Sequence, residues 1–459
     1  MKSVVNFVLL HSIMMNWQQL ISNKRLGQEH RHPERHDDRT EFKRDYDRLI
    51  FSAPFRRLQN KTQVFPLPGS VFVHNRLTHS LEVASVGMSL GNDVAKQLIN
   101  RHPGLKDTLF VEIGQIVATA CLAHDMGNPP FGHSGEKAMQ TYFTEGPGRD
   151  LQREVSHQFW DDITHFEGNA NAFRLLTHQF KGRRPGGFVM TYSMLASIVK
   201  YPYSSSAPSK KGKFGFFNEE KEIYRKVADE LGIICLSGPG EPLRYVRHPL
   251  VYLVEASDDI CYEIMDLEDA HKLKILSYEE TAQLMLSFFD EKEQEHIQKR
   301  IIDEALTDDN EKIVYMRARV IGRLESECVR VFIEHEDEIL NGTFEGSLID
   351  HISEPSNEAY KKCATLSVKR IYKSRPVLDV ELSGYKIMET LMSHFIEAAR
   401  HPDRFYSKQL ISRVSSQYDI DSPNLETRLM AVIDYISGMT DVYALDVYQK
   451  ICGISLPIV

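Results

Sequence analysis

The sequence predicts an all-α fold, predominantly helical with a few short β-hairpins. Apolar side chains recur at helical spacing along most of the 459 residues, and strand signals are sparse. Residues 79–100 carry their apolar side chains mainly on one broad face, whereas 111–123 are apolar almost all round, as in a central buried helix. Further helices are predicted at 190–200, 219–231, 248–266, 278–306, 311–340, 356–372, 382–400, 407–415 and 424–449.

Two short segments favour β-structure. Residues 64–73 (VFPLPGSVFV) contain two prolines and a glycine, which indicate a hairpin-like excursion. Residues 213–217 (KFGFF) form a second candidate strand, and Asn218 after them is a credible helix N-cap. Residues 204–213 (SSSAPSKKGK), which lead into this second segment, are interpreted as a polar loop.

We expect three parts along the chain: an optional or disordered N-terminal extension (1–14), a core domain (15–290) and a helical C-terminal extension packed on the core (291–459). The first residues weakly resemble a secretory signal, but His11 interrupts the apolar run and no small-residue cleavage site follows. No later apolar run approaches the length of a membrane span, so no membrane association is expected.

Composition narrows the class of protein. The formal net charge of −9 excludes a global basic field for nucleic acid or anionic membrane, so an anionic substrate needs local clusters of Lys and Arg. The six cysteines are scattered and form no CxxC pair. This pattern is typical of reduced, buried cysteine in a cytoplasmic protein.

Three separate places offer side chains that bind metal ions. His79 lies in HNRLTHS, the pair His124-Asp125 lies in AHDMGNPPFGH, and Asp258 lies in EASDDICYEIMD. The pair directly follows the buried helix 111–123, where a charged Asp is costly unless it is paired or bound to metal. Glycines and prolines after the pair end the helix, so a site is expected to open there. Imidazole and carboxylate together suit Mn, Fe, Co, Ni, Zn or, less well, Mg.

Each of these residues has an ordinary structural interpretation when taken alone. A single His in a helix is more often a satisfied polar residue than a ligand, and adjacent aspartates such as Asp258-Asp259 usually form a solvated face or a cap. Their order, His, then His-Asp, then a distant Asp, raises the metal interpretation well above these alternatives.

That order resembles the HD phosphohydrolase superfamily. Five strings in the right order are similar to the deoxyguanosinetriphosphate triphosphohydrolase (dGTPase) family: RDYDRLIFSAPFRRLQNKTQVFPL (44–67), HNRLTHSLEV (74–83), ACLAHDMGNPPFGHSGEKAM (120–139), HFEGNANAFRLL (165–176) and EASDDICYEIMDLEDA (255–270). The resemblance runs from about Trp17 to about Ala270 and is weak in the last third. It implies that 15–290 is an HD-domain phosphohydrolase core.

The resemblance also implies roles for individual residues. A divalent metal ion (Mn, Mg or a related transition metal) is expected on His79, His124, Asp125 and Asp258. His133 and Glu136 are expected to handle protons, because an imidazole can relay a proton and a carboxylate one helical turn away can orient it. A capping or packing role for this pair is the alternative.

The expected substrate residues fall into four groups. The triphosphate is assigned to Arg57, Arg76 and Lys200, the sugar to Gln63, Tyr262 and Asp266, and the base to the neighbourhood of Val64; His165, Glu167 and Asn169 are further pocket candidates that could instead cap a helix. Some relatives have His where this sequence has Asn128, although Asn can still donate a hydrogen bond.

The function implied is metal-dependent hydrolysis of a deoxynucleoside triphosphate, with dGTP favoured, to deoxynucleoside and inorganic triphosphate. One alternative is an HD phosphodiesterase or pyrophosphohydrolase acting on a cyclic nucleotide or a guanosine alarmone. Another is a non-catalytic HD protein that binds nucleotide or single-stranded DNA. The strings FGHSGEKA and HFEGNAN argue against the first, and the complete ligand set argues against the second. By resemblance we expect a homo-oligomer, a tetramer or hexamer. Binding of single-stranded DNA as a further partner is compatible with catalysis.

Overall fold

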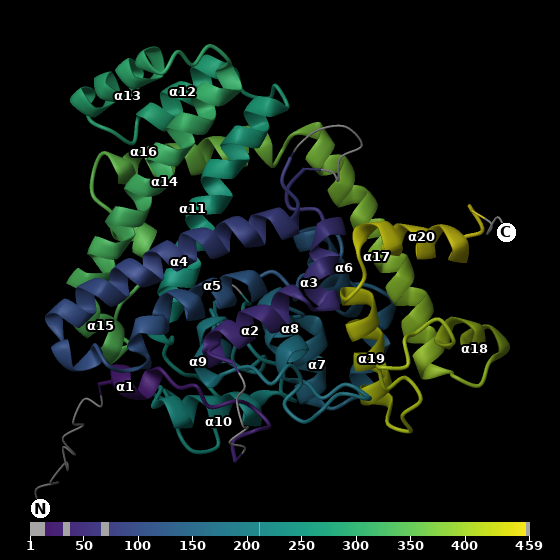
Figure 1. The fold of residues 1–459 in the computed structure, drawn as a ribbon. Coiled ribbons are helices and arrows are strands. Elements are labelled where there is room, and N and C mark those ends of the chain that lie inside the picture. Colours follow the sequence, from purple (N-terminus) through teal and green to yellow (C-terminus); the bar gives the residue numbers. More distant parts are fainter. Residues whose placement is uncertain (1–13, 31–36, 66–72, 211, 456–459) are drawn as a thin grey trace, which may run out of the picture.

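The computed structural model describes residues 14–30, 37–65, 73–210 and 212–455, and within them it confirms the all-α fold. These described ranges contain isolated β-bridges but no strand. The α-helices, labelled in Figure 1, are α1 (Trp17–Leu20), α2 (Glu41–Ile50), α3 (Ala53–Arg57), α4 (Arg76–Arg101), α5 (Ile113–Ala123), α6 (Gly132–Thr144), α7 (His157–Thr164), α8 (Gly168–Thr177), α9 (Tyr192–Ser197), α10 (Lys221–Leu231), α11 (Pro249–Lys272), α12 (Tyr278–Leu286), α13 (Glu291–Asp303), α14 (Asp309–Glu334), α15 (Glu336–Asn341), α16 (Ser356–Leu366), α17 (Arg375–Arg400), α18 (Phe405–Ile411), α19 (Leu425–Ser437) and α20 (Asp441–Ile451). Short 3-10 helices cover Leu58–Asn60, Pro103–Leu105, Leu109–Glu112, Pro147–Arg153 and Leu348–His351, and a π-helical turn covers Ser367–Ile371.

The predicted β-segments contribute little regular structure. An antiparallel bridge between Thr62 and Asn75 brackets the predicted hairpin at 64–73, of which residues 66–72 lie outside the described ranges. The predicted strand at 213–217 does not form, since Phe216 makes a single parallel bridge to Ser204. The segment serves instead to bring buried aromatic side chains into the interior.

The predicted N-cap at Asn218 is wrong, because α10 begins at Lys221 after Glu220. Asn218 instead donates its backbone N–H and its side-chain amide to the buried carboxylate of Asp162, each at 3.0 Å. A buried carboxylate needs hydrogen-bond donors, and Asn218 supplies them to Asp162 instead of capping a helix.

Three long predicted helices are broken in the structure, and one of them, 311–340, divides at His335 into α14 and α15. The segment 278–306 divides into α12 and α13, because Asp290 forms a capping box with Glu293 and starts a new helix. The segment 424–449 divides at Gly438, and Thr440 caps α20 by accepting from the backbone of Tyr443. Helices α1, α2, α3, α6, α7 and α8 lie outside the predicted helical ranges.

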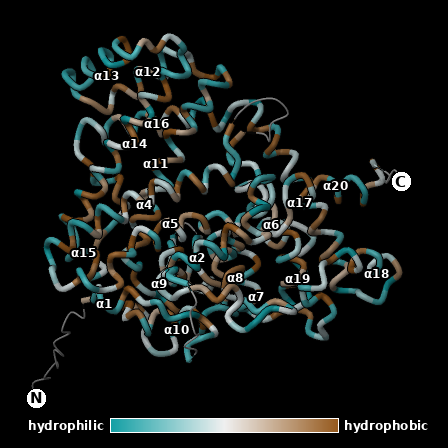
Figure 2. Tube along the Cα trace, viewed as in Figure 1, coloured by the Kyte–Doolittle hydropathy of each residue, from teal (hydrophilic) through white to brown (hydrophobic). Residues whose placement is uncertain are grey.

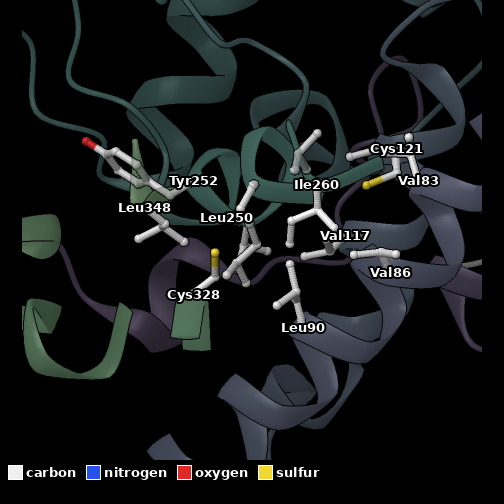
Figure 3. Packing of buried hydrophobic residues seen from close by; sticks show 14 of the residues in the cluster. Val83, Val86, Leu90, Val117, Cys121, Leu250, Tyr252, Ile260, Cys328 and Leu348 are labelled. Carbon is white, nitrogen blue, oxygen red and sulfur yellow. The ribbon is translucent and has the colours of Figure 1, made fainter. Parts of the chain in front are cut away.

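The main core surrounds α5, which is buried on nearly all sides. Figure 3 shows Val83 and Leu90 of α4 beside Val117 of α5, with Ile260 of α11 close by. Glycines allow α4 and α5 to approach closely, since a Cβ on Gly91 would lie 2.7 Å from the Cα of Gly114. The apolar surface of these three helices therefore forms the interior on which the rest of the chain packs.

The C-terminal helices form a second core. Helices α17 and α19 pack together, and α17 also lies along α6, as Figure 1 shows at the right of the molecule. The outer helix α13 is mostly hydrophilic (Figure 2) and buries only Ile297. The predicted boundaries 15–290 and 291–459 stay a prediction, and residues 1–13 of the predicted extension lie outside the described ranges. No helix in the described residues has the length and apolar character needed to cross a membrane.

The turn between α19 and α20 is tied to the middle of the chain. Asp441 accepts hydrogen bonds from the backbone N–H groups of Thr62 (2.8 Å) and Phe131 (2.9 Å). The buried ammonium of Lys61 donates to the Ser437 carbonyl at 3.1 Å. These bonds join two of the sequence motifs to the C-terminal helices.

Arg174 of α8 makes the second such tie. Its guanidinium, only 3% exposed, donates to both oxygens of Asp434 in α19 at 2.9 Å. The same group donates to Glu219 and Glu220 at 2.6 Å each. Burial opposes the charge of Arg174, but the surrounding carboxylates, Asp434 foremost, outweigh it and raise the pKa of the guanidinium.

We expect Arg174→Met to lower the free energy of unfolding by about 3–5 kcal/mol, because it leaves buried carboxylates without a counter-charge. Urea denaturation followed by circular dichroism measures the change. The exposed Arg149 on the 3-10 helix at Pro147–Arg153 provides the control, and Arg149→Met should change stability by no more than about 0.5 kcal/mol. Equal stability of the two variants would contradict the role given to Arg174.

Candidate active site

The four predicted metal ligands come together from three helices. His79 lies on α4, His124 and Asp125 directly follow α5, and Asp258 lies on α11. The distance from His79 Nε2 to Asp258 Oδ1 is 3.0 Å. From His124 Nε2 to Asp258 Oδ1 it is 3.5 Å, and to Asp125 Oδ1 it is 3.6 Å. The helix ends before the His-Asp pair, as the following glycines and prolines predict.

The ring of His124 is fixed by the end of α5. Its Nδ1–H donates to the carbonyl of Cys121 at 2.6 Å, so Nε2 is the atom that faces the carboxylates. Nε2 is buried and has no hydrogen-bond partner. A buried polar atom without a partner is costly, and a hydrogen bond from the other ring nitrogen is the usual way to orient a ligating His. This arrangement fits a ligand atom for a cation.

The charges of the cluster also favour a bound cation. Burial opposes charging of His124, but the carboxylates of Asp125 and Asp258 outweigh it and raise the pKa of the imidazole to about 9. Asp125 is held ionised despite burial, because the Arg76 guanidinium, 2.6 Å away, lowers the pKa of its carboxyl. Asn128 also donates to Asp125, which is the hydrogen-bonding role expected of an Asn at this position. The cluster therefore carries negative potential that favours a cation.

The donor set of two imidazoles and two carboxylates fits a divalent ion. Ligand atoms of His79, His124 and Asp125 all lie within 4.8 Å of one another. Separations of 3.5–3.6 Å are long for hydrogen bonds but close to the ligand–ligand spacing around an ion with bonds of roughly 2.1 Å. These ligand atoms need to move little to hold one ion.

A second cluster, formed by His178, Glu219 and Glu220, is less suited to a metal ion. Arg174 already donates to one oxygen of each glutamate at 2.6 Å. The guanidinium thus occupies the place of the cation, so the cluster of His79, His124, Asp125 and Asp258 is the better candidate.

A cavity of about 210 Å³ opens beside the candidate metal ligands. Its lining includes most of the residues that the sequence singles out, namely Gln63, Arg76, His124, Asp125, His133, Glu136, Glu167, Asn169, Lys200, Asp258 and Tyr262. His79 is 2% exposed and lies behind Asp258. Side chains assigned to metal, phosphate and sugar from distant segments thus share one cavity.

Two predicted substrate residues lie outside this lining because other parts of the fold use them. Arg57 donates to the carbonyl of Gly438 at 2.6 Å, at the turn between α19 and α20. Val64 is partly buried against the main core. Their roles in substrate binding stay predictions.

His165 and Asp266 also lie outside the lining. His165 caps the end of α7, with Nδ1–H donating to the carbonyl of Asp161 at 3.1 Å. Asp266 is buried one turn beyond Tyr262 on α11 and accepts a hydrogen bond from the hydroxyl of Tyr372 at 2.8 Å. Tyr372 comes from the C-terminal third, where the resemblance is weak, so sequence reasoning missed it.

Lys213 is the main lining residue that the sequence analysis missed. It lies where the predicted polar loop 204–213 meets the predicted strand 213–217, and neither prediction gave it a role in the site. Its ammonium lies 2.8 Å from Glu136 Oε1 and 2.7 Å from Glu167 Oε1. The sequence signal was indirect: Glu167 in the string HFEGNAN needs a counter-charge if it is buried, but the string itself does not show that Lys213 supplies it.

Glu136 and Glu167 are both anchored within the fold. Glu136 accepts from the backbone N–H of Gly168 at 3.1 Å, and Glu167 caps α8 by accepting from the backbone of Asn169 at 2.8 Å. Glu167 therefore forms the helix cap that the sequence offered as the alternative to a role in the pocket. His133 is exposed, and within the described residues no hydrogen bond joins it to Glu136. The proton relay between His133 and Glu136 stays a prediction.

The turn before α6 needs glycine for two reasons. Gly132 has φ +57°, in the left-handed region, and a Cβ there would lie 2.6 Å from Nη2 of Arg76. The turn thereby leaves room for the guanidinium that pairs with Asp125.

Comparison with known proteins places these motifs in a family. An HD domain matches residues 76–180, and a phosphohydrolase-associated domain matches residues 351–450. A deoxyguanosinetriphosphate triphosphohydrolase-like protein of Synechocystis is 37% identical, over 96% of this chain and 100% of the relative. The chain belongs to the deoxyguanosinetriphosphate triphosphohydrolase-like family. This membership confirms the resemblance that the five strings indicate.

Other members of the family match over similar lengths. A deoxyguanosinetriphosphate triphosphohydrolase-like protein of Pseudomonas aeruginosa is 36% identical, over 96% of this chain and all of the relative. A deoxyguanosinetriphosphate triphosphohydrolase of Yersinia enterocolitica is 29% identical, over 89% of this chain and 93% of the relative. The HD domain and the phosphohydrolase-associated domain place the chain among HD hydrolases.

We expect Gly132→Ala to destabilise the protein by about 1–3 kcal/mol, because the new Cβ meets Arg76 and the backbone stays left-handed. Urea denaturation measures the change. Gly104→Ala is the matched control, since a Cβ on Gly104 meets nothing within 4 Å. A neutral Gly132→Ala would show that the turn tolerates a side chain.

Proposed function

We propose that the protein hydrolyses deoxynucleoside triphosphates, dGTP among them, to deoxynucleoside and inorganic triphosphate in a reaction that needs a divalent metal ion. Two observations support the proposal. The side chains of His79, His124, Asp125 and Asp258 converge, and the cavity beside them is also lined by Lys and Arg side chains. The names of the relatives, deoxyguanosinetriphosphate triphosphohydrolase and triphosphohydrolase-like proteins, support dGTP as substrate.

The charge of the cavity supports a bound cation. In the described lining, five carboxylates (Asp125, Glu136, Glu167, Glu255 and Asp258) face three cationic side chains (Arg76, Lys200 and Lys213). This excess of carboxylates over cationic side chains in the described lining favours a bound divalent ion. His79, His124, Asp125 and Asp258 would hold that ion, which would supply Lewis-acid activation of a phosphate ester and of water.

Two basic side chains that line the cavity are held in place by carboxylates and are suited to bind a polyphosphate. Arg76 is anchored to Asp125 at 2.6 Å, and Lys200 is 3.1 Å from Glu255. Arg247 holds the other oxygen of Glu255 at 2.8 Å, so the carboxylate that positions Lys200 is itself fixed. Such pre-organised cations stabilise negative charge on phosphate oxygens without reorganisation during the reaction.

Proton transfer is assigned to His133 on α6. Its imidazole is exposed and lines the cavity, so it can exchange a proton with water and with the reacting oxygens. Glu136, one turn further along the helix, would orient it in the substrate complex.

The sugar is assigned to Gln63 and Tyr262. The side-chain oxygen of Gln63 is buried without a partner, so it can accept a hydrogen bond from a ligand hydroxyl. Tyr262 presents a ring to the cavity, and the Asp266–Tyr372 hydrogen bond lies behind it. An aromatic face against C2′ would leave little room for a ribose hydroxyl and so favour deoxyribose.

We expect dGTP incubated with the protein and Mn²⁺ to give deoxyguanosine and inorganic triphosphate. Phosphorus NMR of the digest distinguishes triphosphate from pyrophosphate. Comparison of the four dNTPs and of GTP measures base and sugar preference. Formation of dGMP and pyrophosphate, or no reaction with any dNTP, would contradict the proposal.

We expect His124→Gln to lower Mn²⁺ affinity at least about tenfold and to lose dNTP hydrolysis, because it removes a ligand whose Nε2 has no other partner. Metal content after dialysis, measured by mass spectrometry, gives the affinity independently of activity. His178→Gln, in the cluster already neutralised by Arg174, is the control and should keep both metal and activity. Loss of metal in the control alone would assign the ion to the other cluster.

A further inference from the structure

Lys213 joins two buried carboxylates across the cavity. Its ammonium is 2.8 Å from Glu136 on α6 and 2.7 Å from Glu167 at the start of α8. The glutamate side chains are 10% and 2% exposed, whereas that of Lys213 is 27% exposed and comes from the segment before α10. Lys213 is thus the more accessible member of the set.

The two glutamates differ in how firmly the fold holds them. Glu167 accepts from both the backbone N–H and the side-chain amide of Asn169, at 2.8 and 3.0 Å. Glu136 has one backbone donor, Gly168, and in the described residues Lys213 is its one cationic partner within ion-pair distance. Loss of the Lys213 contact would therefore free Glu136 more readily than Glu167.

His133 precedes Glu136 by three residues on the same helix, α6. Residues three apart on a helix face each other, so their side chains can meet. Glu136 is engaged with Lys213 instead, and His133 is exposed to solvent.

We propose that Lys213 is a positioning residue that withholds Glu136 from His133 until the polyphosphate of the substrate draws its ammonium away. This inference rests on the proposed function, because it needs a polyanion in the cavity. A triphosphate offers several charged oxygens, which compete with the carboxylates for the three N–H donors of the ammonium. Once Lys213 turns to phosphate, the cationic form of His133 becomes the partner within reach of Glu136.

The exchange makes orientation of His133 depend on an occupied cavity. Without substrate, Glu136 stays with Lys213 and Glu167. With substrate, Lys213 binds phosphate oxygens, Glu167 keeps its Asn169 donors, and Glu136 pairs with His133. No covalent bond changes in this step, since only hydrogen-bond partners are exchanged.

A double-mutant cycle on binding of inorganic triphosphate tests the exchange. Calorimetric titration of the full chain with Mn²⁺ present measures the affinity in wild type, Glu136→Gln, Lys213→Met and the double variant. We expect Glu136→Gln to tighten triphosphate binding about tenfold where Lys213 is present, because the competing carboxylate is gone, and at most about twofold in the Lys213→Met background. Equal changes in both backgrounds, or no triphosphate binding by wild type, would overturn the proposal.

Steady-state kinetics with dGTP separate positioning from a purely structural role. Lys213→Met should raise KM about tenfold or more and leave kcat within about threefold, since Glu136 is then free to reach His133. Lys213→Arg should restore much of the KM. Lys210→Met, at an exposed lysine of the same segment, is the control and should behave as wild type. A fall in kcat at unchanged KM would overturn the proposal.

The two proposals fail in distinguishable ways. Phosphorus NMR decides whether dNTP hydrolysis releases triphosphate, whatever Lys213 does. The binding cycle uses triphosphate itself and reports on the exchange even in variants without activity.

Discussion

Pairing of buried carboxylates is the constraint on which this structure depends. Five carboxylates line one cavity at the meeting point of α4, α5, α6 and α11, and a buried unpaired charge is among the most costly features a protein can contain. Arg76 forms an ion pair with Asp125, and Lys213 forms one with Glu136. Glu255 pairs with both Lys200 and Arg247. Asp258 contacts the imidazoles of His79 and His124, and a bound cation would neutralise its negative charge.

The same constraint fastens the C-terminal helices to the rest of the molecule. Arg174 of α8 reaches Asp434 of α19, and Asp441 of α20 accepts from two backbone N–H groups next to the site motifs. The site and the second core are therefore coupled, although their residues lie some 300 positions apart in sequence. Chemistry at the cavity then depends on helices that contribute no predicted metal ligand.

Local sequence predicted α4 from its one-sided apolar repeat, because one-sided burial imposes a period near 3.6 residues. It predicted α5 from a run that is apolar almost all round, as expected of a central buried helix. It overlooked breaks such as Asp290, where a cap interrupts an otherwise continuous repeat. It also overlooked the shorter helices α6 and α8, where glycines and polar site residues weaken the repeat.

The sequence by itself determined the helical class, the family and the order of the candidate metal ligands, because short motifs carry their residue types and spacing locally. Tertiary structure alone decided which side chains meet. It turned Arg57 toward Gly438, set Asp266 against Tyr372 and brought Lys213 between Glu136 and Glu167. The reason is physical: counter-charges are matched through space, and a buried carboxylate accepts whichever cation the packing of distant helices brings within reach.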